Sequence, residues 1–325
     1  MANYIVFGTG VIGRKAYELL DKNVIFAFCD NNEHFENEEF LGKPVFNARY
    51  LRDIYKKGNY IVVLATTKLN NVIEIARQLD EMGISFVLLE DVAREVVRDE
   101  AKAYEEMTPP SSFRYDADME YIIPMERIEE AGVVSSYLWQ DMWAARYIIR
   151  ERPRVHYDIG SRLDGFITHL LSAGVDVTML DIRPLPTRIA RLSFVQADAT
   201  NLDNITDNSL ESLSALCSLE HFGLGRYGDP IDPMACFKCF DSIQRKMKPG
   251  GLLYISVPVG KEHLEFNAHR VFAASTIVNS FPEMELLEFS SCMKEEYEEN
   301  IPLDKYDDWD QYGGERFGLF RFRKK

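Results

Sequence analysis

The chain has 325 residues, of which 46% are hydrophobic, and a formal net charge of -15 at pH 7. This length and apolar fraction predict two domains with buried cores, and an acidic charge spread over both halves disfavours general nucleic-acid binding, which normally needs a basic patch. No run of about 18 apolar residues could span a bilayer, and the first residues resemble a strand rather than a signal peptide. We therefore expect a cytoplasmic protein without a membrane partner.

The first 90 residues follow the order of a small parallel sheet with connecting helices. Strands are predicted at 3–7, 24–30, 60–66 and 86–90, and an amphipathic helix at 70–82. Such alternation is typical of a Rossmann-like α/β domain, which we assign to residues 1–91.

A glycine-rich turn follows the first predicted strand. Gly8, Gly10 and Gly13 have the GxGxxG spacing of a dinucleotide-binding turn, where backbone N–H groups and the helix dipole hold a diphosphate. The next strand ends at Asp30, followed by Asn31, and these two would face a ribose or base. Two hypotheses stay open: a second nucleotide site, or a nucleotide fold kept as a scaffold or homodimer surface. An NAD-dependent oxidoreductase is a further alternative, although no dehydrogenase catalytic domain follows.

Residues 92–152 are predicted to form a helical linker and lid. An acidic helix at 92–107 is interrupted by the prolines within 108–112, where we place the domain boundary. A second helix at 135–149 carries aromatic and aliphatic residues at helical spacing. Its Gln140 is the best polar candidate for covering a cofactor, while the tryptophans are expected to pack in the core.

Residues 153–325 contain a second series of strands with acidic residues at their ends. The first strand ends at Asp158 and Gly160, the second at Asp181 and the third near Asp198. In open α/β sheets ligands bind beyond the carboxyl ends of the strands, so these acids are expected to converge on one ligand. Asp181 is suited to accept both hydroxyl protons of a ribose, and Asp198 to accept an exocyclic adenine amine.

The remaining strands are predicted at 210–218, 247–260, 283–292 and 316–324. The last two alternate well enough to pair as an antiparallel hairpin that closes the sheet. Cys236 and Cys239, three residues apart on a predicted helix, share one helix face and are expected to pack in the core.

Two sets of motifs carry a family resemblance. The order of strands, glycines and acids from Val155 to Val259 is similar to that of class I S-adenosylmethionine-dependent methyltransferases. More narrowly, GLGRYGDPIDP (223–233) and FNAHR (266–270) resemble a bacterial branch often associated with surface-polysaccharide biosynthesis. The N-terminal domain resembles the Rossmann-like domains of bacterial sugar-modifying enzymes. Together these resemblances imply a fold of two Rossmann-like domains, an S-adenosyl-L-methionine cofactor, and methylation of a hydroxyl on a sugar or sugar nucleotide.

The resemblance also implies a cofactor site at the strand ends and on the lid helix. Its expected residues are Gln140, Asp158, Gly160, Ser161, Arg162, Asp181, Ile182, Asp198, Ala199 and Ser218. Arg162 and Asp164 stand where the family often has glycines, and Gly165 is displaced by one position. Arg162 is expected to pair either with the methionine carboxylate of the cofactor or with a surface acid.

Transfer of a methyl group to a hydroxyl requires in-line alignment and a base for the hydroxyl proton. The leading candidate is His221, since an imidazole titrates near working pH, and His269 is the second. Alternatively, His221 only holds its loop. The acceptor is expected to contact Arg226, Asp229, His263 and Arg270. No metal is expected, and a non-catalytic nucleotide-binding scaffold or sensor is the alternative function.

Overall fold

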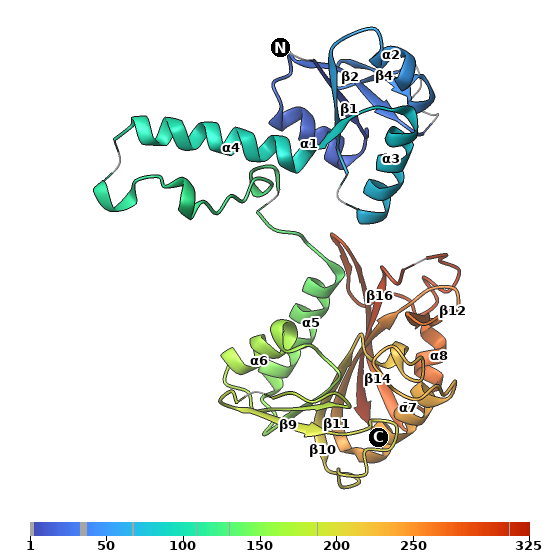
Figure 1. Cartoon of the computed structure of the whole chain (residues 1–325). Coiled ribbons are helices and arrows are strands. Elements are labelled where there is room, and N and C mark those ends of the chain that lie inside the picture. Colours follow the sequence, from blue (N-terminus) through green and yellow to red (C-terminus); the bar gives the residue numbers. More distant parts are fainter. Residues whose placement is uncertain are drawn as a thin grey trace. The chain divides into compact units, whose positions relative to one another are not determined.

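The computed structural model describes residues 3–32, 38–66, 68–108, 110–129, 131–186, 188–311 and 313–325. The chain divides into two compact units, Met1–Gly132 and Val133–Lys325 (Figure 1). Each unit has its own sheet and its own buried clusters, so each is described by itself. None of the helices in these described ranges is long and apolar enough to cross a bilayer.

The N-terminal unit is built on a six-stranded sheet. In chain order its elements are β1 (Asn3–Phe7), α1 (Val11–Leu19), β2 (Ile25–Asp30), β3 (Glu39–Phe40), β4 (Lys43–Asn47), α2 (Leu51–Tyr55), β5 (Tyr60–Leu64), α3 (Leu69–Met82), β6 (Phe86–Leu88) and α4 (Leu89–Glu106). The strand order is β3-β4-β2-β1-β5-β6, with every pair parallel except β3 and β4. Apart from β3, this is the strand order of a doubly wound α/β sheet, so the predicted α/β fold class is confirmed.

Strand β1 shows why this sheet has helices on both faces. Ile5 and Phe7 point to one face and share a buried cluster with Leu79 of α3. Val6 points to the opposite face and shares a cluster with Ala16 of α1. A central strand of a parallel sheet is covered twice, and its apolar residues therefore run without interruption.

The predicted linker does not form a segment of its own. α4 and the residues after it belong with the first unit, whereas α5 (Ser136–Glu151) belongs with the second. The chain after α4 is held to that helix by polar contacts such as the ion pair of Arg98 with Glu120 at 3.2 Å. The boundary therefore lies after residue 132, beyond the prolines, because the acidic helix finds its partners in the segment that follows them.

The C-terminal unit contains an eight-stranded sheet and a small hairpin. After α5 its elements are β7 (His156–Ile159), α6 (Thr168–Ser172), β8 (Val177–Asp181), β9 (Leu192–Gln196), β10 (Leu210–Leu216), α7 (Ala235–Lys246), β11 (Met247–Pro258), β12 (His263–Glu265), β13 (His269–Val271), α8 (Ala274–Asn279), β14 (Met284–Met293), β15 (Glu296–Glu298) and β16 (Phe317–Lys324). The strand order is β15-β14-β16-β11-β10-β7-β8-β9. β16 runs antiparallel between β11 and β14, which confirms the predicted closing hairpin.

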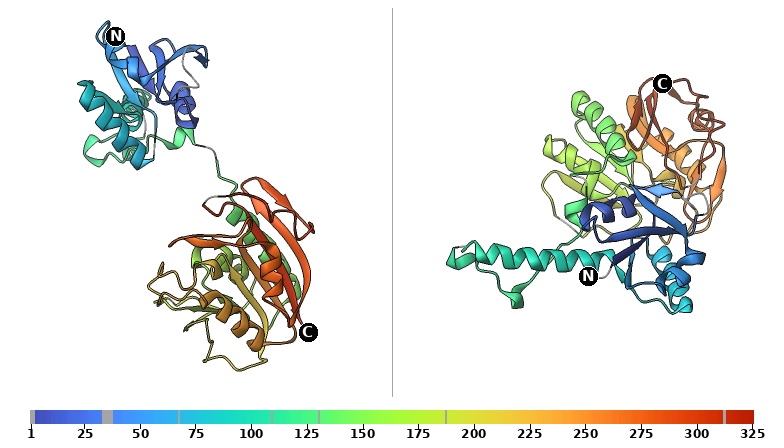
Figure 2. Two further views of the ribbon diagram at one scale, coloured as in Figure 1. Left: turned by 90° about the vertical axis from the view of Figure 1, so that its right-hand side faces the viewer. Right: turned by 90° about the horizontal axis from the view of Figure 1, so that it is seen from above.

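Helices cover both faces of this sheet (Figures 1 and 2). On one face, α5 and α6 contribute Trp143 and Leu170 to a buried cluster. On the other face, α7 contributes Phe240, Cys236 and Cys239, and the two cysteines are fully buried there. Their predicted role in core packing is confirmed by this placement.

The strand order changes direction between β7 and β10. β8 and β9 extend the sheet on one side of this pair, and β11 extends it on the other. The helices that follow, α6 after β7 and α7 after β10, pack on opposite faces. Such a reversal opens a crevice beyond the carboxyl ends of the strands, where open α/β sheets bind ligands.

Candidate active site

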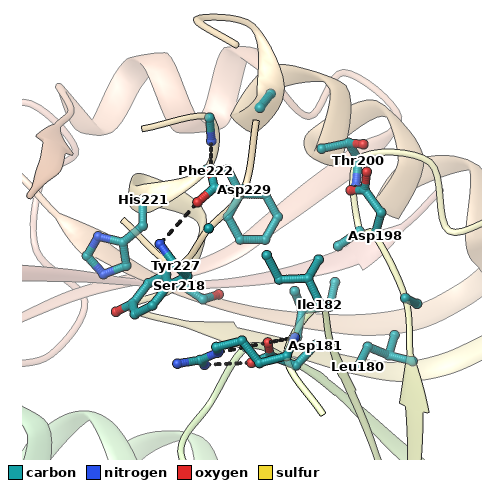
Figure 3. A pocket seen from close by; sticks show the side chains of 18 of the residues that line it. Leu180, Asp181, Ile182, Asp198, Thr200, Ser218, His221, Phe222, Tyr227 and Asp229 are labelled. Carbon is teal, nitrogen blue, oxygen red and sulfur yellow. Dashed lines mark hydrogen bonds and ion pairs between the residues drawn. The ribbon is translucent and has the colours of Figure 1, made fainter. Parts of the chain in front are cut away.

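Two neighbouring cavities lie beyond the carboxyl ends of β7, β8, β9 and β10. The first has a volume of about 370 Å³ and is lined by the ends of these strands and by the loop after β10 (Figure 3). The second has a volume of about 640 Å³ and is lined by α5, the turn after β7 and the loop after β10. Both are lined by Gly160, Arg183, Cys217, His221 and Tyr227, which makes them parts of one site.

The turn after β7 depends on a glycine. Gly160 has a φ of +77°, in the left-handed region that favours glycine, and a Cβ there would lie 2.9 Å from the Cβ of Ser218. Both residues line the first cavity, so the backbone itself forms part of the wall. The buried hydroxyl of Ser218 has no hydrogen-bond partner among the residues that the structure describes, which leaves it available to a bound group.

Asp158 lies behind the cavity wall rather than on it. Its carboxylate accepts hydrogen bonds from Ser161 N (3.0 Å), Ser161 Oγ (2.9 Å) and Ser214 Oγ (2.5 Å). Complete burial raises the pKa of Asp158 to about 6, and the hydrogen bonds limit this rise. Asp158 lines neither cavity, in contrast to its predicted direct contact with the cofactor, and instead holds the glycine turn.

The hydrogen bonds continue from Asp158 into the sheet. His156 has Nε2 2.8 Å from Ser214 Oγ and Nδ1 2.8 Å from Ser212 Oγ. Complete burial lowers the pKa of His156 to about 3, so its imidazole is neutral at pH 7. A line of polar side chains on β7 and β10 thus supports the turn from inside the sheet.

Asp181 lies where the sequence predicts, at the end of β8 and on the wall of the first cavity. Arg183 folds back onto it: the backbone N (2.8 Å), Nε (3.0 Å) and Nη2 (2.7 Å) of Arg183 all donate to the carboxylate. The guanidinium carbon also lies 4.4 Å from the centroid of the Tyr227 ring. Both oxygens of Asp181 are therefore engaged by a side chain that lines both cavities.

The predicted cofactor residues divide between the two cavities. The first cavity holds Asp181, Ile182, Asp198, Ala199 and Ser218; the second holds Gln140, Ser161 and Arg162; and Gly160 lines both. Figure 3 shows Asp181 and Asp198 at two edges of the same hollow, with Ile182 between them. Asp198 also accepts a hydrogen bond from the backbone N of Thr200 at 2.8 Å, which orients its carboxylate.

Helix α5 forms part of the wall of the second cavity. Gln140 is buried, accepts a hydrogen bond from Ser256 Oγ at 2.6 Å and donates to Asp141 Oδ1 at 3.1 Å. Asp141 comes so close to the turn after β7 that a Cβ at Gly165 would lie 2.8 Å from its Oδ2. Burial raises the pKa of Asp141. Although displaced by one position, Gly165 therefore permits a close contact between α5 and this turn.

Three arginines line the second cavity, and their partners differ. Arg183 is paired with Asp181. Arg162 is exposed and pairs with Asp164 through Nε (3.0 Å) and Nη2 (2.8 Å), which corresponds to the surface-acid alternative. Arg226 donates from Nη1 to Ala268 O at 2.9 Å, and no carboxylate of the described residues lies within ion-pair distance of it. Arg226 is therefore a cation without a counter-ion in this part of the structure.

Glu220 and His221 belong to the 3-10 turn η7 (Leu219–His221) after β10. His221 Nδ1 lies 2.6 Å from Ala268 O, and His221 Nε2 lies 3.5 Å from Glu220 Oε1. Burial lowers the pKa of His221 to about 4 and raises the pKa of Glu220 to about 8, so both side chains are mostly uncharged at pH 7. The buried Oε2 of Glu220 has no hydrogen-bond partner within the described ranges.

Two residues predicted to contact the acceptor are used to hold loops. Asp229 lines the first cavity, but its carboxylate accepts hydrogen bonds from Gly223 N at 2.7 Å and Tyr227 N at 3.2 Å. Arg270 lines neither cavity and donates to Phe222 O at 2.7 Å. Backbone groups in tight buried loops need partners, and these two side chains provide them.

His263 and His269 lie on the β12–β13 hairpin, and neither lines either of the two cavities of this site. Both face Glu265: His263 Nε2 is 3.1 Å from Oε1, and His269 Nε2 is 3.3 Å from Oε2 without hydrogen-bond geometry. The structure therefore does not place His269 against an acceptor, contrary to its predicted role as the second base. Over the ranges that the structure describes, no group of three or more His, Cys, Asp or Glu side chains is arranged to hold a metal ion.

The predicted residues of the N-terminal unit follow the ends of β1 and β2. Gly8 and Gly10 lie in the turn after β1, Gly13 in α1, Asp30 at the end of β2 and Asn31 directly after it. Asp30 Oδ2 accepts hydrogen bonds from Thr9 N (2.8 Å) and Thr9 Oγ1 (2.7 Å), and Oδ1 accepts one from Asn32 N (2.9 Å). Asn31 and Gln78 join their side-chain amides by two hydrogen bonds of 3.0 Å. The polar groups expected to face a nucleotide are therefore used within the unit.

The sequence predicted no role for Arg183 or Cys217, and it placed Tyr227 only in a loop. For Arg183 a signal exists, because it follows Asp181 by two residues, and residues two apart lie on the same side of an extended chain. Cys217 falls inside the strand predicted at 210–218, whereas β10 ends at Leu216. For Tyr227 no comparable signal exists, since the direction of a loop side chain depends on the loop's own geometry.

Part of the chain matches a family model. The model is described as a Caenorhabditis protein of unknown function, DUF268, and it matches residues 175–308. No curated protein matches the chain.

Several solved structures are similar to the chain. The Burkholderia thailandensis 1,6-didemethyltoxoflavin-N1-methyltransferase, with S-adenosylhomocysteine bound, has a TM-score of 0.42 and 18% identity over 59% of this chain and 79% of that one. The N-methyltransferase NodS of Bradyrhizobium japonicum has a TM-score of 0.40 and 15% identity over 71% and 98%. The [4+2]-cyclase SpnF has a TM-score of 0.41 and 16% identity over 57% and 81%. All three TM-scores are below 0.5, so these similarities establish no activity for this chain.

Proposed function

We propose that the protein is an S-adenosyl-L-methionine-dependent methyltransferase that methylates a hydroxyl of a sugar or sugar nucleotide in cytoplasmic steps of surface-polysaccharide biosynthesis. One observation carries the proposal: Asp181 and Asp198, at the ends of neighbouring parallel strands, line one cavity of about 370 Å³ beside Gly160. A carboxylate at such a strand end accepts ribose hydroxyls, and a cavity of a few hundred Å³ suits an adenosine-sized ligand.

The residues of both cavities suit the parts of this cofactor. Asp181 would accept the ribose hydroxyls, and Asp198 the adenine amine. The buried Ser218 hydroxyl, unpaired among the described residues, offers a further polar contact. Gly160 and Ser161 form the passage toward the second cavity, where the methionine part would lie. When bound, the cofactor supplies a methyl group on a positively charged sulfur.

We propose that His221 takes the proton of an acceptor hydroxyl. Its Nδ1 donates to Ala268 O at 2.6 Å, so Nε2 is the nitrogen that could accept a proton. Because burial lowers the pKa of His221 to about 4, the imidazole is unprotonated at pH 7 but is a weak base. We therefore expect the proton to leave the hydroxyl while the new O–C bond forms, rather than before.

The second cavity is proposed as the acceptor site. It has a volume of about 640 Å³ and contains the guanidinium of Arg226, which has no carboxylate partner in the described part of the chain. A sugar nucleotide carries a diphosphate, and arginine binds phosphate oxygens through paired N–H donors. The N-terminal unit, whose sequence resembles domains of sugar-modifying enzymes, would serve as a second nucleotide site or as a homodimer surface.

Calorimetric titration with S-adenosylhomocysteine tests the cofactor site without knowledge of the acceptor. We expect micromolar binding that is lost in Asp181→Ala and kept in Asp203→Ala, an exposed acid that lines neither cavity. No binding by the wild-type protein at millimolar ligand would contradict the proposal.

Turnover is tested with a panel of sugar nucleotides and radiolabelled cofactor. Transfer of label that is lost in Asp181→Ala would support a methyltransferase. Cofactor binding without transfer to any acceptor would favour the scaffold or sensor. Tight NADH binding that is lost in Gly10→Val would favour the oxidoreductase.

A further inference from the structure

Arg183 occupies the carboxylate oxygens of Asp181 that the proposed cofactor site assigns to the ribose. The inference drawn from this overlap rests on the proposed function. A ribose diol donates to both oxygens of the acid that binds it. In the structure, Asp181 Oδ1 already accepts Arg183 N and Nε, and Oδ2 accepts Arg183 Nη2. Each carboxylate oxygen accepts about two hydrogen bonds, so Oδ1 is already full, whereas Oδ2 can accept one more. The ribose can therefore donate to both oxygens only if Arg183 Nε releases Oδ1, which breaks the two-point contact of the guanidinium.

A displaced Arg183 would stay at the junction of the two cavities, because it lines both. Its guanidinium carbon lies 4.4 Å from the ring centroid of Tyr227, and that of Arg226 lies 5.4 Å from the same centroid. The acids of the second cavity are poor new partners. Asp164 already has an arginine partner, and burial of Asp141 favours its uncharged form.

Two arginines would then share one aromatic ring. Arg226 donates to a backbone carbonyl and has no carboxylate partner among the described residues, and Arg183 would have lost its own. Neighbouring positive charges in a partly enclosed cavity repel each other, so an anion between them lowers the free energy. Phosphate suits this position well, because its oxygens accept paired N–H donors from more than one arginine.

We propose that Arg183 exchanges partners: it binds Asp181 in the unliganded protein, and a phosphate group of the acceptor once the cofactor ribose occupies Asp181. Cofactor binding then releases the arginine that the acceptor needs, so the acceptor binds second. By thermodynamic linkage, the acceptor phosphate must strengthen cofactor binding by the same factor as the cofactor strengthens phosphate binding.

Inorganic pyrophosphate and S-adenosylhomocysteine are the probes, and calorimetry measures each alone and in the presence of the other. In the wild-type protein we expect each probe to tighten the binding of the other by at least about fivefold. In Arg183→Gln this coupling should disappear, while S-adenosylhomocysteine alone should bind as tightly as in wild type or more tightly, because no ion pair has to break.

Two further variants sharpen this experiment. Arg183→Lys keeps the charge without the two-point geometry, so we expect intermediate coupling. Arg191→Gln removes an arginine that pairs with Asp176 at 2.9 Å outside both cavities, and it should keep the wild-type coupling. Thermal unfolding verifies that each variant is folded.

The outcomes separate the exchange from the function on which it rests. Coupling that persists in Arg183→Gln, or wild-type binding of S-adenosylhomocysteine without any effect on pyrophosphate, would overturn the exchange alone. Weaker binding of S-adenosylhomocysteine by Arg183→Gln would also overturn it, since removal of a competitor cannot weaken a ligand. Absence of S-adenosylhomocysteine binding in wild type would overturn the proposed function and the exchange together.

Discussion

Both units contain a strand, a glycine turn, a helix and a second strand that ends in an acid, yet the two acids have different partners. Asp30 of the N-terminal unit accepts backbone and hydroxyl groups of its own neighbourhood, from Thr9 and Asn32. Asp181 of the C-terminal unit lies on a cavity wall and accepts mainly from Arg183, whose side chain is 45% exposed and can move. The difference teaches that strand order places an acid, whereas the partners of that acid decide whether a ligand can reach it.

The largest expected effect comes from removing each acid in turn. Asp181→Ala should weaken S-adenosylhomocysteine binding at least about 100-fold, or about 3 kcal/mol, because the ribose loses its acceptor. Asp30→Ala should leave this affinity within about twofold, because that acid has only local partners. Calorimetry measures both. If both variants were folded and lost the same amount of affinity for S-adenosylhomocysteine, the proposed difference between Asp181 and Asp30 would be wrong.

Glu220 extends the comparison to an acid whose Oε2 has no partner in the described structure. Its pKa is raised from 4.5 to about 8 in the folded protein, so the folded protein holds this proton more tightly than the unfolded chain does. The contribution of Glu220 to the free energy of unfolding is therefore largest below about pH 4.5 and falls as the pH rises toward 8. Glu220→Gln removes this titration. Between pH 5 and 8, urea unfolding should show the wild type losing on the order of 3 kcal/mol relative to the variant.

The control for this pH series is Glu285→Gln, which changes an exposed acid on β14. It should follow the wild-type curve. Parallel pH curves for wild type and Glu220→Gln would contradict the assignment of Glu220 as a protonated acid at neutral pH.

Each glycine turn begins with a glycine of positive φ directly after its strand, Gly8 after β1 and Gly160 after β7. Gly160→Ala forces a φ of +77° on an alanine, which costs about 1–2 kcal/mol, and brings its Cβ against Ser218. We expect a lower unfolding temperature and S-adenosylhomocysteine binding weakened about tenfold, since about 1.4 kcal/mol corresponds to that factor. An alanine variant with wild-type affinity would show that the cofactor does not contact this turn.

The smallest effect is expected for Gly10, the second glycine of the N-terminal turn. Gly10 has a φ of -72°, and a Cβ there would meet nothing within 4 Å. Gly10→Ala should therefore change the free energy of unfolding by no more than about 0.5 kcal/mol, measured by urea unfolding. A large loss would mean that this turn is more constrained than its surroundings indicate.

Most of the sheet could be predicted because core-facing residues repeat with the period of each element. The boundaries were harder. Residues 86–89 form one short apolar run, which does not distinguish a strand from a helix start, and α4 in fact begins at Leu89. β15 escaped prediction because Glu296 and Glu298 look solvated in sequence, whereas both lie within ion-pair distance of the buried Arg316.

The candidate site was predictable where the backbone alone places a residue. Asp181 is the last residue of β8 and Asp198 follows β9, so both reach the carboxyl edge of the sheet. Asp158 is one residue short of the end of β7, and its side chain turns into the sheet instead. The partner of Asp181 could not be predicted, because the path of Arg183 depends on how the chain turns after the strand.

In the hydrogen-bond chain that runs from Asp158 through Ser214 to His156, the donor and the acceptor of each bond are fixed. An ionised carboxylate only accepts, so Ser214 must donate its proton to Asp158, and its Oγ can then only accept from His156 Nε2. A neutral imidazole carries one proton, so His156 Nδ1 must accept from Ser212. The tautomer of His156 is thus set by the charge of Asp158, two residues along the same strand. Protonation of Asp158 near pH 6 would release that choice and open both tautomers to His156.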